Sequence, residues 1–158
     1  MNAQVWIAIL VGLAAVIDDL RRRQIANWIP AVALASGLGW QVASYGWMGW
    51  LYGLGGAMAG FAVFLVFYLL GGMGGGDVKL MTGFGALLGS GRLVEAALWT
   101  AGVGGLLALG VLGYRAIRGK LASAPGPDST PEEKLKHESI PYAPAIALGV
   151  WLSLVPKG

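Results

Sequence analysis

Long apolar runs, separated by short polar or glycine-rich breaks, constrain the fold of this chain more than any other sequence feature. A helix needs about 20 apolar residues to cross a hydrocarbon layer of about 30 Å, and fewer where other helices shield it or the bilayer is thinned. Six runs approach this requirement, at about residues 3–20, 28–45, 50–70, 78–88, 93–114 and 141–155. The sequence therefore predicts an all-α integral membrane protein, a six-helix transmembrane bundle in which residues 1–158 form a single domain.

The low charge of the chain supports this prediction. Charged residues make up 12% of the sequence, whereas soluble domains carry roughly 25%, so the chain lacks the polar surface that a water-soluble globule needs. The net charge of +3 does not indicate nucleic-acid binding, because the basic residues lie in short clusters between apolar runs. Cysteine is absent from the sequence, which excludes disulfides and thiolate metal sites. No Lys or Arg precedes the first apolar run, so we interpret that run as a retained helix and not as a signal peptide.

The distribution of basic residues predicts the orientation, because cytoplasmic loops of membrane proteins are enriched in Lys and Arg. With the N-terminus outside, the loops after the first, third and fifth runs face the cytoplasm and contain nine of the eleven basic residues, Arg92 and Lys157 being the exceptions. The same orientation, in the inner (cytoplasmic) membrane, brings Asp18, Asp19 and Asp77 to the cytoplasmic face.

The longest polar segment, residues 115–140, is predicted to be a cytoplasmic loop within this domain. It contains a Pro-, Ser- and Gly-rich linker at 122–129, followed by Thr130-Pro131-Glu132-Glu133, which is typical of a helix start. We therefore expect a short solvated helix over about residues 131–138.

Small residues recur at a spacing of four in two of the predicted spans, which places them on one helix face. The pairs are Gly49/Gly53, Gly56/Gly60 and Ala101/Gly105. Such faces let helix backbones approach closely in a membrane. We expect them to pack inside the bundle, with a contact between copies in an oligomer as the alternative.

Four carboxylates lie within or beside the apolar runs, where a charged side chain costs a few kcal/mol. They are Asp18, Asp19, Asp77 and Glu95. A structural explanation exists for the aspartates: the first two can pair with the basic residues at 21–23, and Asp77 can be stabilised by the dipole of a helix that begins beside it. Glu95 can extend outward near Arg92.

Three observations favour a functional role for Asp77 over a helix cap. It closes a glycine-rich stretch at 71–76, and glycine permits both close backbone approach and unusual conformations. The apolar run after it, 78–88, would rise only about 17 Å as a helix, which places Asp77 below the headgroups in a dent open to water. The predicted orientation also brings the carboxylates of the first run to the same level.

Two facing aspartates in a poorly solvated pocket can catalyse hydrolysis. Neighbouring like charges disfavour ionisation of both groups, so the pair shares a proton. One carboxylate then accepts a proton from an attacking water while the other polarises a peptide carbonyl. Either Asp18 or Asp19 could partner Asp77, because adjacent helical residues point about 100° apart and only one can face it. This chemistry requires no cofactor or metal, and we expect none; the single histidine, His137, lies in the polar loop.

Three segments in order resemble the motifs of the type IV prepilin peptidases, which are intramembrane aspartyl proteases. Residues 19–27 are similar to the first active-site motif, an aspartate followed by a basic stretch and Ile-Pro-Asn. The second segment, residues 74–81, looks like the GxGD motif, and residues 141–149 resemble the last span of the family. The second segment reads Gly74-Gly75-Gly76-Asp77-Val78-Lys79-Leu80-Met81. The resemblance covers nearly the whole chain, with one departure: Ala26 stands where the family usually has proline, which weakens the turn and leaves the chemistry intact.

The resemblance implies that Asp19 and Asp77 are the catalytic pair. Its motifs also include Gly74, Gly76, Lys79 and Asn27 as supporting residues. It implies that the chain removes a short basic leader from prepilin-like substrate proteins at the cytoplasmic membrane face. Larger bacterial members also methylate the new N-terminus through an insertion with paired cysteines. The short first loop and the lack of cysteine indicate the peptidase-only form, as in Flp/Tad pilus systems or archaeal preflagellin peptidases.

The sequence leaves three alternatives to compare with this hypothesis. Presenilin-like proteases share GxGD but have a Tyr-Asp first motif, which Val16-Ile17-Asp18-Asp19 does not provide. A small proton-coupled transporter or channel would require polar residues spread through the membrane, whereas here they gather at one face. A structural assembly protein would leave the glycine-rich stretch before Asp77 unexplained.

Overall fold

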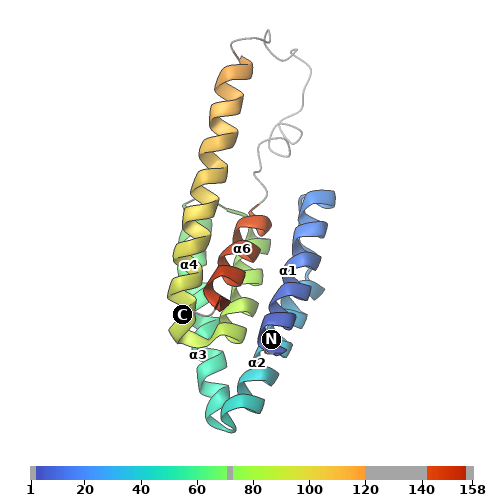
Figure 1. Cartoon of the computed structure of the whole chain (residues 1–158), viewed down its shortest axis with the longest axis vertical. Helices are drawn as coiled ribbons and strands as arrows, with labels where there is room; N and C mark the ends of the chain where they lie inside the picture. Colours follow the sequence, from blue (N-terminus) through green and yellow to red (C-terminus); the bar gives the residue numbers. More distant parts are fainter. Residues whose placement is uncertain (1–2, 71–72, 120–141, 156–158) are drawn as a thin grey trace.

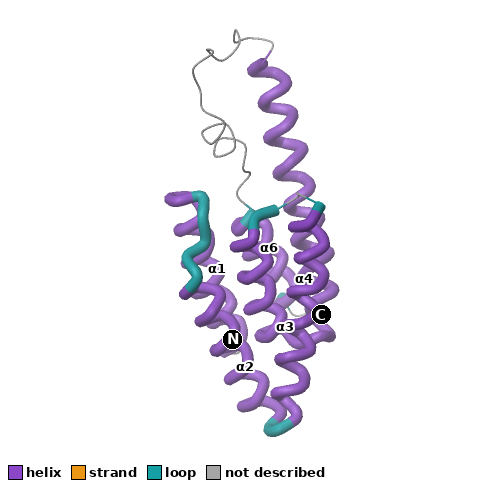
Figure 2. The backbone as a smooth tube through the Cα atoms, turned by 180° about the vertical axis from the view of Figure 1, so that it is seen from behind, coloured by secondary structure: helices purple, strands orange, loops and turns teal. Residues whose placement is uncertain are grey.

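The computed structural model describes residues 3–70, 73–119 and 142–155, and every regular element in these ranges is an α-helix (Figures 1 and 2). The helices are α1 (Ala3–Arg22), α2 (Trp28–Tyr45), α3 (Met48–Leu69), α4 (Gly75–Gly119) and α6 (Ala143–Leu154). The predicted all-α class is confirmed, and the predicted bounds of α2 agree with the structure. The short helix expected at 131–138 lies outside the described residues.

Helix α4 contains two of the predicted spans, joined by a bend at Gly89. The loop expected between 88 and 93 is replaced by one residue, Gly89, with φ 68° and ψ 172°, a conformation that favours glycine. The bend frees the carbonyl oxygen of Leu87, which accepts hydrogen bonds from the side-chain amides of Gln4 (2.8 Å) and Gln41 (3.1 Å). The arm before the bend and the longer arm after it supply the fourth and fifth helical segments, and the second arm extends beyond the rest of the bundle (Figure 1).

Close backbone contacts hold α3 against the first arm of α4. A Cβ added at Gly56 would overlap the carbonyl oxygen of Gly85, and one added at Gly60 would lie 2.8 Å from the carbonyl oxygen of Met81. The expectation of internal packing is therefore confirmed for α3, whose glycines 49, 53, 56 and 60 are all buried. It is wrong for Ala101 and Gly105, which are exposed on the second arm.

Helix α6 fills the space between α1 and the second arm of α4. Its Trp151 packs over Gly12 and donates a hydrogen bond from Nε1 to the carbonyl oxygen of Ala8 (3.0 Å). Its Gly149 lies against Thr100 of α4, so closely that a Cβ there would be 2.6 Å from the Thr100 nitrogen. These contacts place the first residues of α6 beside the last turn of α1, where the carboxylates lie.

The outer surface of the described helices is apolar. Helices α1 and α3 are each long and apolar enough to cross a membrane, while α6 is apolar but shorter. Large hydrophobic side chains on several helices face outward, among them Leu10 (63% exposed), Leu51 (64%) and Leu98 (70%). The first arm of α4, residues 75–88, rises about 21 Å, somewhat longer than the sequence predicted because the helix begins at Gly75.

Candidate active site

A cavity of about 350 Å³ opens at the end of the bundle where α1 ends and α4 begins. Asp19 (7% exposed) and Asp77 (8%) both line it, although they come from different helices. The two carboxylates therefore border the same space. The other residues that line it are Arg23, Gln24, Ile25, Asn27, Gly74, Gly75, Gly76 and Lys79. Glu95 lies on the second arm of α4 and is not among the residues that line this cavity.

Asp19 occupies the last turn of α1 and is held by the start of α6. Its Oδ2 accepts a hydrogen bond from the backbone N–H of Ala143 (3.2 Å), the first residue of α6. The positive end of the α6 dipole also favours an anion here. Sequence reasoning missed this contact, although Pro144 in the first turn of α6 marks where that helix starts.

Asp77 lies in the first turn of α4 and binds the backbone just before it. Its Oδ2 accepts a hydrogen bond from the N–H of Gly74 (3.2 Å), while its own N–H donates to the carbonyl oxygen of Gly74 (3.1 Å). Close approach explains one glycine: a Cβ at Gly76 would meet the side chain of Ile25 at 3.3 Å. The expected unusual conformations are not found at Gly74–Gly76, because none of these three residues has a positive φ.

Asn27 and Lys79 meet at the rim of the cavity. Lys79 Nζ donates a hydrogen bond to Asn27 Oδ1 (2.9 Å), which joins the start of α2 to the first turn of α4. Arg23 lines the same cavity and adopts a left-handed conformation with φ 51° just after α1 ends. Two cationic side chains therefore line the same cavity as the two carboxylates.

Asp18 faces away from this cavity and fastens the loop between α1 and α2. Its Oδ1 lies 3.3 Å from Arg22 Nε, and its Oδ2 accepts a hydrogen bond from the N–H of Ala26 (2.8 Å). Residue spacing left open whether Asp18 or Asp19 faces Asp77; in the structure Asp19 lines the cavity together with Asp77, and Asp18 is not among the lining residues. A proline at position 26, as in the family motif, could not form this bond, because proline has no N–H to donate. In this chain the turn therefore has a hydrogen bond from Ala26 in place of the rigidity that proline would provide.

Replacing Asp18 by Ala should loosen this loop. The change leaves the Ala26 N–H without its partner and costs about 1 kcal/mol, or about fivefold in the population of the ordered loop. We expect trypsin to cut at the exposed Arg21–Arg23 segment about fivefold faster, measured by mass spectrometry of the protein in detergent. Asp18→Asn is the matched control, since its side-chain oxygen can still accept the bond. Equal rates for Asp18→Ala and the unchanged protein would show that the bond does not order the loop.

The fold and the cavity together define a helical bundle that has two helices long and apolar enough to cross a membrane and two buried carboxylates at one end. A model of the type IV leader peptidase family matches residues 6–109, more than half of the chain and including both aspartates, and the chain belongs to that family. The resemblance found in the sequence is thereby confirmed at the level of the family. Neither the curated proteins nor the solved structures contain a significant match to the chain.

Proposed function

We propose that this protein is a prepilin leader peptidase that hydrolyses the peptide bond after the basic leader of type IV prepilin-like proteins. The observation that carries the proposal is the joint burial of Asp19 and Asp77 in one cavity of about 350 Å³. Each carboxylate has one oxygen held by a backbone N–H, so both are oriented before a substrate arrives. Because each molecule of liquid water occupies about 30 Å³, the cavity could hold about ten waters. This space is sufficient for a substrate backbone and the attacking water.

In this mechanism the two aspartates share the acid–base work. The ionised aspartate accepts a proton from water as the water oxygen attacks the carbonyl carbon of the scissile bond. The protonated aspartate donates a hydrogen bond to the carbonyl oxygen and stabilises the tetrahedral intermediate. The C–N bond then breaks as a proton passes to the leaving amine, and the aspartates return to the shared-proton state. No side chain becomes covalently attached to the substrate.

The proposed setting is the inner membrane, crossed six times with the N-terminus outside. The six helical segments are α1, α2, α3, the two arms of α4, and α6. Because α1 ends and the first arm of α4 begins at the cavity, both aspartates lie at the same face, which the basic residues assign to the cytoplasm. The first arm of about 21 Å is shorter than a hydrocarbon layer of about 30 Å, so water can reach the cavity from that side.

We further propose the peptidase-only form of the family, as in Flp/Tad pilus systems. The loop between α1 and α2, residues 23–27, is too short to hold an additional catalytic insertion, and the chain contains no cysteine. The pilin product should therefore leave this protein with an unmethylated N-terminal amine.

Co-expression with a prepilin tests the proposal. We expect membranes that contain this protein to convert the prepilin to a shorter product, with a mass that matches leader loss and no added 14 Da of a methyl group on its N-terminus. A product with the added methyl would contradict the peptidase-only form. If the prepilin stays intact and proteoliposomes show a proton flux that depends on Asp77, the protein is a transporter and not a peptidase.

A further inference from the structure

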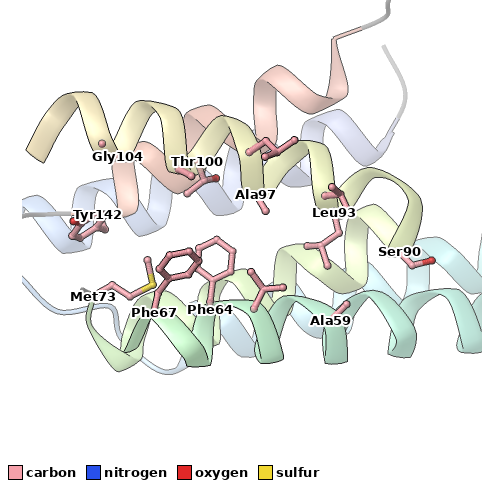
Figure 3. Close-up of a pocket in the computed structure, with 15 residues that line it drawn as sticks. Ala59, Phe64, Phe67, Met73, Ser90, Leu93, Ala97, Thr100, Gly104 and Tyr142 are labelled. Atoms are coloured by element: carbon pink, nitrogen blue, oxygen red, sulfur yellow. The ribbon is translucent and has the colours of Figure 1, made fainter. Parts of the chain in front are cut away.

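A second, largely apolar groove runs between α3 and the second arm of α4, with hydroxyl groups only at Ser90, Thr100 and Tyr142 among its described lining residues (Figure 3). Its volume is about 480 Å³, within the range of about 300–1,000 Å³ found for binding pockets. Phe64 and Phe67 of α3 form one wall, and Leu93 and Ala97 of α4 face them across the groove. No charged residue is among the described residues that line it.

One end of this groove adjoins the carboxylate cavity. Met73 and Tyr142 close that end, whereas Ser90 lies at the other (Figure 3). The residue after Met73 is Gly74, whose N–H binds Asp77, and the residue after Tyr142 is Ala143, whose N–H binds Asp19. The groove therefore begins one residue away from both backbone donors that hold the aspartates.

The shape of the groove fits one face of a helix. The α4 wall extends from Ser90 to Gly105, about 22 Å at 1.5 Å per residue, or about four turns. Ala101 and Gly105 lie exposed along it, and a Cβ added at Gly105 would meet nothing within 4 Å. Small exposed residues next to large apolar side chains let another helix approach and insert its own side chains. The Ala101/Gly105 pair, which does not pack inside the bundle, therefore lies on a surface that another helix can cover.

We propose that this groove binds an apolar helical segment of the substrate, on the side of the cleaved bond opposite the basic leader. The inference rests on the proposed function, because it assigns one surface to each side of the scissile bond. A substrate chain that leaves the carboxylate cavity beside Gly74 reaches the end of the groove at Met73, the neighbouring residue. The groove then holds the substrate as an added transmembrane helix and fixes which bond reaches the aspartates.

Site-specific photo-crosslinking tests the occupant directly. The protein carries Asp77→Asn, so that substrate is retained uncut, and a benzoylphenylalanine replaces either Ala101 in the groove or Gly110 on the opposite face of the same arm. Positions 101 and 110 are nine residues apart, about 180° around the helix. We expect position 101 to capture the apolar segment of a prepilin at least tenfold more than position 110, as read by mass spectrometry of the crosslinked peptide. Capture of phospholipid alone at 101 would overturn the proposal, as would equal capture at both positions.

A matched pair of glycine variants gives the second measurement. Gly105→Phe fills the groove, while Gly110→Phe adds the same side chain where an added Cβ also meets nothing within 4 Å. We expect Gly105→Phe to slow leader removal at least tenfold and Gly110→Phe to retain the rate of the unchanged protein. Equal rates for both variants would exclude the groove as the docking surface while leaving the peptidase intact. Failure of the unchanged protein to cut any prepilin would instead remove the proposed function, so the two failures are distinguishable.

Discussion

Asp19→Asn and Asp77→Asn should each abolish leader removal, lowering the cleavage rate by at least about 10³-fold. General acid–base catalysis contributes typically about 10²–10⁴-fold, and here both steps depend on the same pair of groups. An asparagine keeps the size of the side chain, and its oxygen can still accept the N–H of Ala143 or Gly74. It can neither accept the proton of the attacking water nor donate one to the amine. The rate of mass loss from a prepilin in membranes measures the effect.

Asp18→Asn is the internal control for this pair. It removes a carboxylate next to Asp19, yet Asp18 lies outside the shared cavity and binds Arg22 and Ala26 instead. We expect this variant to retain leader removal within about threefold, since the hydrogen bond to Ala26 can persist. Normal cleavage by Asp19→Asn or by Asp77→Asn would refute the pair. Loss of cleavage in Asp18→Asn, with both other variants active, would move the catalytic role to Asp18.

The helices could be predicted from the sequence because polar residues or glycines bound each apolar run, although two of the runs are joined in α4. The bounds expected for α2 match those found, and the others differ by a few residues, mostly where glycine or Arg extends a helix beyond its apolar part. The bend at Gly89 could not be predicted in the same way. It depends on Gln4 and Gln41, two residues from other helices whose amides bind the freed carbonyl of Leu87.

The candidate site shows the same division between local and distant information. Local spacing identified Asp77 and the two adjacent aspartates, but it could not distinguish Asp18 from Asp19. The resemblance to the family motif selected Asp19, and the structure adds a contact that spacing could not show: the N–H of Ala143, 124 residues away, donates a hydrogen bond to Asp19. The contact between Lys79 and Asn27 was also hidden, although both residues belong to the motifs. Motifs therefore identified the residues, and the packing of α1, α4 and α6 sets their arrangement.

The four-residue spacing of small residues has two different outcomes in this protein. In α3, glycines 49, 53, 56 and 60 are buried against neighbouring helices. On the second arm of α4, Ala101 and Gly105 have the same spacing and remain exposed beside the apolar groove. Spacing alone cannot separate these outcomes, because it specifies a helix face but not what covers that face. Only the position of α3 relative to the two arms decides which face is covered.

Gly56→Ala should destabilise the fold strongly, whereas Gly55→Ala should not. A Cβ at Gly56 would overlap the carbonyl oxygen of Gly85 and lie 2.9 Å from Gly89 Cα, both rigid backbone atoms of α4. Overpacking of this kind costs about 3 kcal/mol, which corresponds to a fall of about 10 °C in the unfolding midpoint for a chain of this size. At Gly55 an added Cβ meets nothing within 4 Å, and alanine favours the helix over glycine by up to about 1 kcal/mol. Thermal unfolding of both variants in the same detergent measures the contrast.

The clash at Gly56 also has a consequence for the site, because Gly85 lies on the arm of α4 whose first turn contains Asp77, and Gly89 forms the bend at the end of that arm. Separating α3 from this arm displaces the bend and the start of the second arm, which forms one wall of the apolar groove. Gly56→Ala should therefore reduce the rate of leader removal even at temperatures below its unfolding midpoint, whereas Gly55→Ala should retain the rate of the unchanged protein. If both variants unfold at the same temperature, the close contact between α3 and α4 does not hold the bundle together. If Gly56→Ala is less stable but cleaves normally when folded, the position of the first arm is fixed by α2 and α6 instead.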